Sequence, residues 1–219
     1  MTGVVYEELE SARVARILRT DILVGRRRPG SRLVEREIAA ELGVSRLPVR
    51  EAIRALVAEG IVISRPRSWA VVRQFTFQDI QDFAEVREAI ETQVFVLAAE
   101  RHDERGLALL RRALEAEEAA AEQGDFATAR EQGGDFHELT VHLAGNKMLL
   151  ELVGVFVTRL RWLFGQHEDL TSMVAEHRRL YDAIAARDTE LVRTLIIDHM
   201  AKGRVDAERR LRESSGFSI

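Results

Sequence analysis

Apolar residues recur with a helical period along most of this chain, most clearly in ELGVSRLPVREAIRALVAEGIV, residues 41–62. The apolar side chains there fall at i, i+3, i+4, i+7 and i+8, which places them on one face of a helix. They are Val49, Ala52, Ile53, Leu56 and Val57. Ser45 precedes the helix and offers a hydroxyl cap, and Gly60 ends it because glycine readily adopts a left-handed conformation. We therefore predict an amphipathic helix with a defined beginning and end.

A shorter amphipathic helix is predicted immediately upstream, in VEREIAAELG, and Gly43 opens the turn between the two helices. On the longer helix, arginines spaced by four form a row away from the apolar face: Arg46, Arg50 and Arg54. Two short helices joined by a Gly-Val-Ser turn, the second beginning with arginines, form a helix-turn-helix. The second helix of such a motif can read the major groove of DNA. The alternative interpretation is that the arginine row is an ordinary solvated helix face.

Two short β segments, residues 61–64 and 70–74, follow the longer helix, with RPRSW between them as a turn. A hairpin directly after a helix-turn-helix is typical of a wing. Arg65 and Arg67 at its tip can reach phosphates or the minor groove, or they belong to an ordinary polar turn.

Apolar periodicity also predicts a helix before this region, at residues 11–24, and six long helices after it. The six are expected at residues 79–101, 103–122, 126–144, 147–165, 170–187 and 188–212. Thr76 and Asp79 offer a capping pair for the first of them. Short loops between long helices are typical of an antiparallel bundle. We expect a mainly α fold: an N-terminal winged helix-turn-helix with a small β-hairpin wing at residues 1–75, and a C-terminal antiparallel six-helix bundle at residues 76–219.

Charge is divided unevenly between these two parts. Residues 1–73 hold 14 Arg and nine Asp or Glu, a net charge of +5, whereas the remainder carries −9 and the whole chain −4. A basic N-terminal part is typical of a module that binds a polyanion, and the acidic remainder indicates a separate partner.

Composition excludes several classes of protein. Apolar residues make up 46% of the chain and charged residues 31%, as in globular rather than disordered proteins. The sequence has no apolar run of about 18 residues and no signal peptide at its N-terminus, so we expect no membrane span and a cytoplasmic location. The absence of cysteine excludes disulfides, thiolate metal sites and cysteine nucleophiles.

The six histidines all lie in the predicted bundle: His102, His137, His142, His167, His177 and His199. Histidines on different helices of a bundle can converge on one metal ion, and imidazole suits zinc, nickel, copper or iron. No pair has the His-x-x-x-His spacing of a site borne on one helix. Unrelated surface or core histidines are therefore the alternative.

The segment GSRLVEREIAAELGVSRLPVREAIRALVAEGIV closely resembles the winged-helix signature of the GntR regulators. The later segments EVREAIE, DFHELTVHLAGN, EHRRLYDAIAARD and DHM resemble the FCD ligand-binding domain of the FadR branch of that family. Together the resemblance covers roughly Val14 to Arg212. It implies a homodimeric, ligand-responsive transcriptional regulator that binds a near-palindromic double-stranded DNA operator, and it implies no enzyme activity.

The resemblance also implies roles for individual residues. The implied DNA-binding residues are Arg36, Ser45, Arg46, Arg50, Arg65 and Arg67. The implied ligands of a divalent metal, zinc or nickel, are His137, His177 and His199. Arg87 matches an arginine that lines the effector pocket and pairs with a small carboxylate effector.

Two positions depart from the family pattern. The aspartate that usually stands four residues before the first metal-binding histidine is Gly133 here. Asp135 is nearby but on a different face of a regular helix, so it could join the site only through local distortion at Gly133-Gly134. The helix-capping Ser or Thr of the family is Val34, at an expected cost of about 1 kcal/mol.

Four functional interpretations follow from the sequence. The favoured one is a repressor released by a carboxylate effector bound near the metal. A metal-responsive regulator without an organic effector is the first alternative, and a helical-bundle metalloenzyme is the second. A regulator that binds fatty-acyl ligands is the third, and the three retained histidines argue against it.

Overall fold

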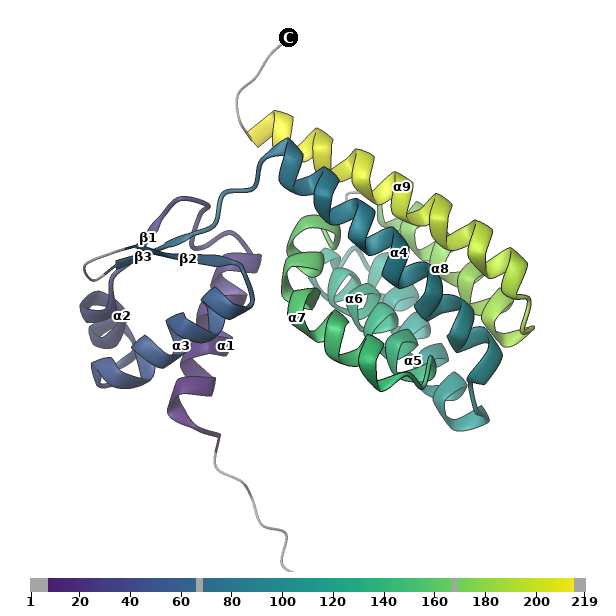
Figure 1. The fold of residues 1–219 in the computed structure, drawn as a ribbon, viewed down its shortest axis with the longest axis horizontal. Helices are drawn as coiled ribbons and strands as arrows, with labels where there is room; N and C mark the ends of the chain where they lie inside the picture. Colours follow the sequence, from purple (N-terminus) through teal and green to yellow (C-terminus); the bar gives the residue numbers. More distant parts are fainter. Residues whose placement is uncertain (1–7, 66–68, 167–168, 215–219) are drawn as a thin grey trace, which may run out of the picture. The chain divides into compact units, whose positions relative to one another are not determined.

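The computed structural model describes residues 8–65, 69–166 and 169–214. The chain divides into two compact units (Figure 1). One runs up to Gln74 and includes Val155–Arg159, and the other comprises Phe75–Gly154 and the chain from Leu160 onward. The described residues are mainly helical, as predicted.

The first unit is a winged helix-turn-helix. Its elements are α1 (Glu10–Leu23), β1 (Arg32–Leu33), α2 (Glu35–Leu42), α3 (Arg46–Ala58), β2 (Val62–Arg65) and β3 (Trp69–Val72). The three strands form an antiparallel sheet in the order β1-β3-β2. The hairpin of β2 and β3 is the predicted wing, and its tip, residues 66–68, lies outside the described residues. The periodicity did not predict β1, because two residues are too short to show an alternating pattern.

Local rules explain the turn and the helix ends of this unit. Gly60 follows α3 with the predicted left-handed conformation, at φ 75°, and Gly43, which was predicted to open the turn, ends α2 with φ 66°. Ser45 occupies the N-cap position of α3, but the prediction of a hydroxyl cap was wrong, because its side chain makes no capping bond. The third residue of α3 is Pro48, which has no N–H to donate to such a cap. Val34 caps α2 without a side-chain bond, as its residue type requires.

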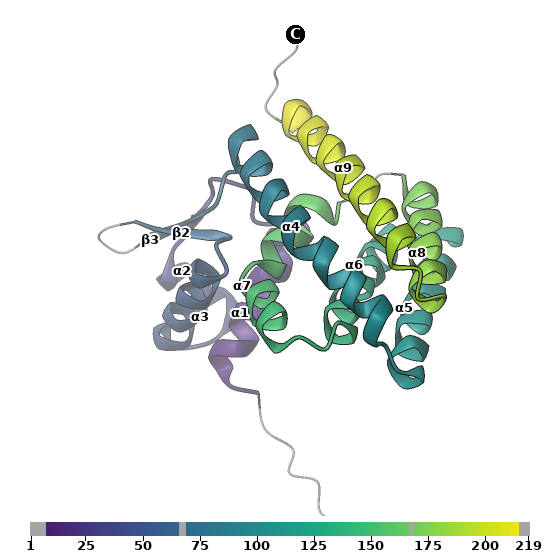
Figure 2. The ribbon, with the colours of Figure 1, turned by 45° about the vertical axis from the view of Figure 1, so that its right-hand side comes forward.

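The second unit contains the predicted bundle. The helices of the bundle are α4 (Phe77–Arg101), α5 (Glu104–Glu122), α6 (Phe126–Leu143), α7 (Lys147–Phe164), α8 (Leu170–Ala185) and α9 (Thr189–Ser214), and the segment Val155–Arg159 of α7 is grouped with the first unit. Figures 1 and 2 both show α4 and α9 running side by side. Helix α6 continues through Gly133 and Gly134 without a break, so the distortion considered there does not occur. None of the helices described is long and apolar enough to cross a bilayer.

Side-chain caps define where the bundle helices begin. Thr76 and Asp79 form a reciprocal capping box at α4, with the Asp79 amide donating to Thr76 Oγ1 at 3.1 Å and the Thr76 amide donating to Asp79 Oδ2 at 2.8 Å. At four further helices the N-cap side chain accepts a hydrogen bond from a backbone amide of the first turn: Asp103, Asp125, Asn146 and Asp169. Short polar turns therefore fix the helix lengths.

We expect Thr76→Ala to lower the free energy of unfolding by about 1 kcal/mol, because it removes the hydroxyl acceptor of the box. Chemical denaturation followed by circular dichroism measures this change. Thr171→Ala is the matched control, since Thr171 is exposed within the first turn of α8 and is not its cap. Equal losses in the two variants would contradict a capping role.

Candidate metal centre and nucleic-acid interface

Three histidines from three helices meet inside the bundle. His137 comes from α6, His177 from α8 and His199 from α9. Their ring centroids lie 5.0–5.2 Å apart, and one ligand atom of each lies within 4.8 Å of the others. His177 and His199 are 1% and 2% exposed, so this is an interior group and not a surface cluster. The structure thus brings together the three histidines that the family resemblance singled out.

The Nδ1 atom of each of these histidines is hydrogen-bonded to a carboxylate. Three glutamates on separate helices provide them, at 3.0 Å from Glu91 to His137, 2.8 Å from Glu117 to His177 and 2.8 Å from Glu176 to His199. An imidazole that donates its Nδ1–H to a carboxylate keeps a lone pair on Nε2 for a metal.

The Nε2 atom of His177 provides a test of whether a metal fits. It is buried and has no hydrogen-bond partner among the described residues. A buried polar atom without a partner is unfavourable, and a bound cation would remove that penalty. Three imidazoles backed by carboxylates therefore fit a divalent ion of the zinc or nickel type.

Burial and nearby charges favour the neutral form of two of the histidines, His137 and His199. Burial lowers the pKa of His137 and lowers that of His199 well below its usual value, and the charge of Arg87 lowers both further. Burial alone would raise the pKa of Glu91, but Arg87 and His137 outweigh it and bring the pKa to about 2. The lowered pKa values of His137 and His199 favour neutral imidazoles, and that of Glu91 favours an anionic carboxylate, the forms that bind cations without first losing protons.

Arg87 is connected to the histidine group through the carboxylate of Glu91. Its Nε atom donates to Glu91 Oε1 at 2.7 Å, while the other oxygen of Glu91 lies 3.0 Å from His137 Nδ1. The guanidinium also lies over the ring of Phe164, 4.9 Å from its centroid. The predicted effector arginine is thus beside the histidines, and its charge is already paired with Glu91.

The remaining acids and histidines considered from the sequence do not join this group. Asp135 pairs instead with Arg161 at 2.6 Å, and its side chain is 41% exposed. His142 is exposed on α6, and His102 is buried at the end of α4. His167 lies outside the described residues.

Glu35, the first residue of α2, holds the arginines at the start of α3. Arg50 donates to it through Nε and Nη2, both at 2.9 Å, and Arg46 donates through Nη2 at 3.3 Å. The hydrogen bond from Arg50 is the main cause of the lowered pKa of Glu35. Both arginine side chains stay largely exposed, at 59% for Arg46 and 46% for Arg50. The N-terminal part of α3 therefore presents two oriented, solvent-accessible guanidinium groups.

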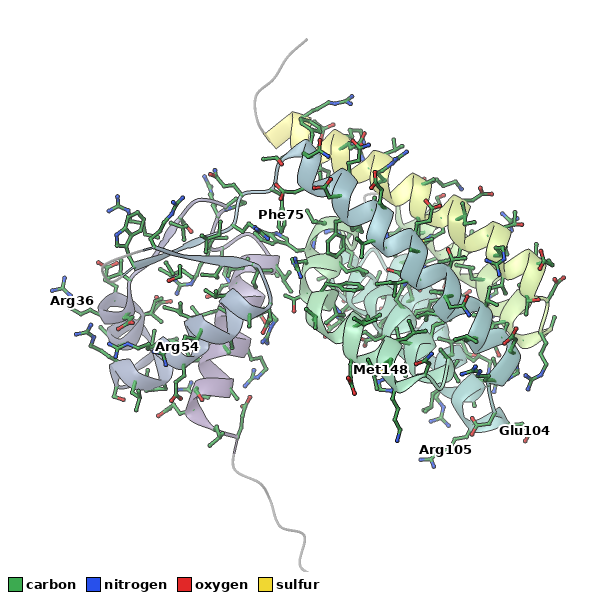
Figure 3. The ribbon with its side chains drawn as sticks, viewed as in Figure 1. Arg36, Arg54, Phe75, Glu104, Arg105 and Met148 are labelled. Atoms are coloured by element: carbon green, nitrogen blue, oxygen red, sulfur yellow. The ribbon has the colours of Figure 1, made fainter. Side chains whose placement is uncertain are left out.

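The other predicted DNA-binding residues lie on the same unit. Arg36 is exposed and extends outward from α2 (Figure 3). Ser45 is exposed just before α3, and Arg65 is exposed at the end of β2. Arg67 lies outside the described residues. The guanidinium of Arg32 lies over the ring of Trp69, 4.4 Å from its centroid, at the tip end of the hairpin.

Two protein-family models match the chain. The model of the gntR family of bacterial regulatory proteins covers residues 10–72, and the FCD domain model covers residues 82–202. The chain belongs to the GntR family and carries an FCD domain. Members of this family are transcriptional regulators and not enzymes, so the metalloenzyme interpretation is set aside.

Several relatives resemble this GntR regulator over most of its length. The HTH-type transcriptional regulator YdhC of Bacillus subtilis (strain 168) is 30% identical over 188 residues, 83% of this chain and 84% of YdhC. The HTH-type transcriptional repressor RspR of Escherichia coli (strain K12) is 28% identical over 191 residues, 85% of this chain and 84% of RspR.

Solved structures share the fold. E. coli McbR/YncC superposes with a TM-score of 0.80 at 23% identity, over 93% of this chain and 99% of that protein. A GntR protein from Rhodococcus sp. RHA1 gives a TM-score of 0.75 at 28% identity, over 90% of this chain and 96% of that protein.

The sequence did not predict the contacts of four glutamates of this GntR regulator: Glu35, Glu91, Glu117 and Glu176. Glu91 lies four residues after Arg87, a spacing that predicts a helical ion pair. Glu176 is adjacent in sequence to His177 but contacts His199. Glu35 and Glu117 act across helices, and no local pattern identifies their partners.

We expect Arg87→Ala to destabilise this GntR regulator by about 3–5 kcal/mol, because Glu91 would remain buried with its charge uncompensated. Arg111→Ala is the matched control, since Arg111 and Glu115 form an ion pair of the same i, i+4 type whose side chains are 56% and 57% exposed. That change should cost less than about 1 kcal/mol. Denaturant titration measures the free energy of unfolding of both variants. Similar losses of stability in the two would argue against a buried ion pair.

Proposed function

We propose that this GntR regulator is a repressor whose operator binding is released by a small carboxylate bound at a divalent metal in its helical part. On this proposal, residues 1–75 bind DNA, and residues 76–219 bind metal and effector and form the homodimer. The observation that supports it most is the interior histidine group, with a carboxylate on each Nδ1 and a buried Nε2 of His177 that lacks a partner.

The proposed metal ligands are His137, His177 and His199. A bound zinc or nickel ion would supply positive charge and open coordination positions for an anionic ligand. Glu91, Glu117 and Glu176 would orient the three rings, and burial would exclude water from the group. Arg87 would add a second positive charge near the effector carboxylate while remaining paired with Glu91.

In the DNA-binding part, two copies of α3 would enter successive major-groove segments of a near-palindromic operator. Arg46, at the helix N-terminus, would contact phosphate, and Arg50 would read a base, with guanine as the natural target of its planar fork. Glu35 orients both side chains, because it accepts two hydrogen bonds from Arg50 and one from Arg46. Arg36, Ser45, Arg65 and Arg67 would add backbone and minor-groove contacts.

The effector can act only if it binds one arrangement of the DNA-binding parts better than another. We propose repression of transcription and not activation, because the relative RspR is named a transcriptional repressor. A regulator that responds to metal alone remains the second candidate, and the same histidine group supports it.

We expect Arg50→Ala to lower the ratio of specific to non-specific DNA affinity by about tenfold or more, because one bidentate base contact contributes about 1–3 kcal/mol of discrimination. The measurement compares a binding site selected from random DNA with a scrambled version at one salt concentration. Arg54→Ala, one turn further along α3, should change the ratio much less. Equal loss on both DNAs in Arg50→Ala would assign that arginine to phosphate.

We expect His177→Ala to lose bound zinc or nickel and, with it, the response of operator binding to small carboxylates. Elemental analysis gives the metal content, and fluorescence anisotropy with lactate, succinate and citrate gives the response. His142→Ala should behave as the unchanged protein, because His142 is exposed on α6. Unchanged metal content in His177→Ala would sink the site, whereas release of operator by zinc or nickel alone would favour the metal-responsive regulator.

A further inference from the structure

Gly133 is a glycine that its backbone does not require. It lies in the continuous helix α6 and does not have a positive φ. Glycine in a helix interior costs about 0.5–1 kcal/mol relative to alanine, so the position needs another reason. A Cβ atom there would lie 2.9 Å from Oε1 of Glu117 and 3.4 Å from Cε1 of His177. The missing side chain therefore leaves the space that the Glu117 carboxylate fills.

Glu117 reaches this space from α5 and is 0% exposed. Its two carboxylate oxygens lie 2.9 and 2.8 Å from Nδ1 of His177. The other two glutamates of the centre each have a cation, because Arg87 pairs with Glu91 and Lys202 lies 2.5 Å from Glu176. Within the described residues, Glu117 is bonded to His177 alone.

A buried carboxylate needs a compensating positive charge. Glu117 contacts one side of the imidazole ring of His177, and a positive charge can bind on the other side, at Nε2, the buried atom without a partner. The Glu117 carboxylate would offset the positive charge of a divalent cation bound at that nitrogen, with the ring between them, as in carboxylate–histidine–metal triads.

We propose that Glu117 is the positioning residue of this centre and supplies, from a different helix, a carboxylate beside His177 where Gly133 carries none. It holds His177 with Nε2 facing the centre and supplies the negative charge that strengthens the ring as a ligand. Gly133 is its matched counterpart, because any side chain there would displace the Glu117 carboxylate. This inference rests on the proposed metal centre.

Glu117→Gln tests the charge while keeping the shape of the side chain. Zinc affinity, measured in the full-length protein by competition with a chelating indicator, should fall about 10–100-fold. The matched control is Glu118→Gln, the next residue of α5, whose carboxylate pairs with Arg178 and not with a histidine of the centre. It should leave zinc affinity within about twofold of the unchanged protein.

The metal-free protein provides a readout that separates positioning from a structural role. Glu117→Gln removes a buried charge, so its melting temperature without metal should equal or exceed that of the unchanged protein while zinc binding weakens. A lower melting temperature combined with unchanged zinc affinity would show that Glu117 only supports the fold, and it would overturn the proposal.

Two glycine variants test the counterpart. Gly133→Ala should weaken zinc binding at least tenfold, because its Cβ displaces Glu117 from His177. Gly134→Ala is the control on the same helix, since its Cβ meets at 3.0 Å the guanidinium of Arg161, which pairs with Asp135 and Glu138 and not with a histidine of the centre. The control should bind zinc normally. Equal zinc affinity in the two alanine variants would overturn the proposal, and this comparison carries the test if Glu117→Gln does not fold.

A rescue variant completes the design. Gly133→Asp combined with Glu117→Ala returns a carboxylate to the centre from α6 and should recover at least tenfold of the affinity lost in Glu117→Ala alone. No recovery would overturn the interchange of the two acids. Failure of the unchanged protein to bind zinc or nickel would overturn the metal centre itself. Normal binding that is insensitive to Glu117 and Gly133 would overturn this inference alone.

Discussion

The bundle depends on the pairing of charged and polar groups in its interior. Burying an ion without a partner costs several kcal/mol, so each buried carboxylate must lie beside a cation or a hydrogen-bond donor. Glu91 meets that requirement with Arg87 and His137, and Glu176 meets it with His199 and Lys202. The apolar faces determine that the helices pack together, and these polar contacts determine how the side chains inside are oriented.

The same kind of constraint operates in the DNA-binding part. Arg46 and Arg50 begin a helix, where the positive end of the helix dipole disfavours cations. Glu35 at the start of α2 offsets this, and its two-oxygen contact with Arg50 fixes the plane of the guanidinium. One carboxylate thereby stabilises the turn between the two helices and orients the side chains that are proposed to meet DNA.

Most of the fold could be predicted from the sequence because its signals are local. Apolar spacing located each long helix to within a few residues, and the predicted cap at Thr76 marked the beginning of one of them. Local reasoning failed at Ser45, where Pro48 removes the N–H that a cap would bind. It also missed β1, whose two residues form a strand only because β3 pairs with them.

The sequence by itself determined the winged helix-turn-helix, the helical bundle, the GntR likeness and the three histidines that matched a metal site. Only the tertiary structure decided which acids serve those histidines. Asp135 is two residues from His137 yet turns to Arg161, whereas Glu117 lies 60 residues from His177 and contacts it. A helix separates neighbours in sequence onto different faces, and packing brings distant faces together, so partners across helices leave no local pattern to read.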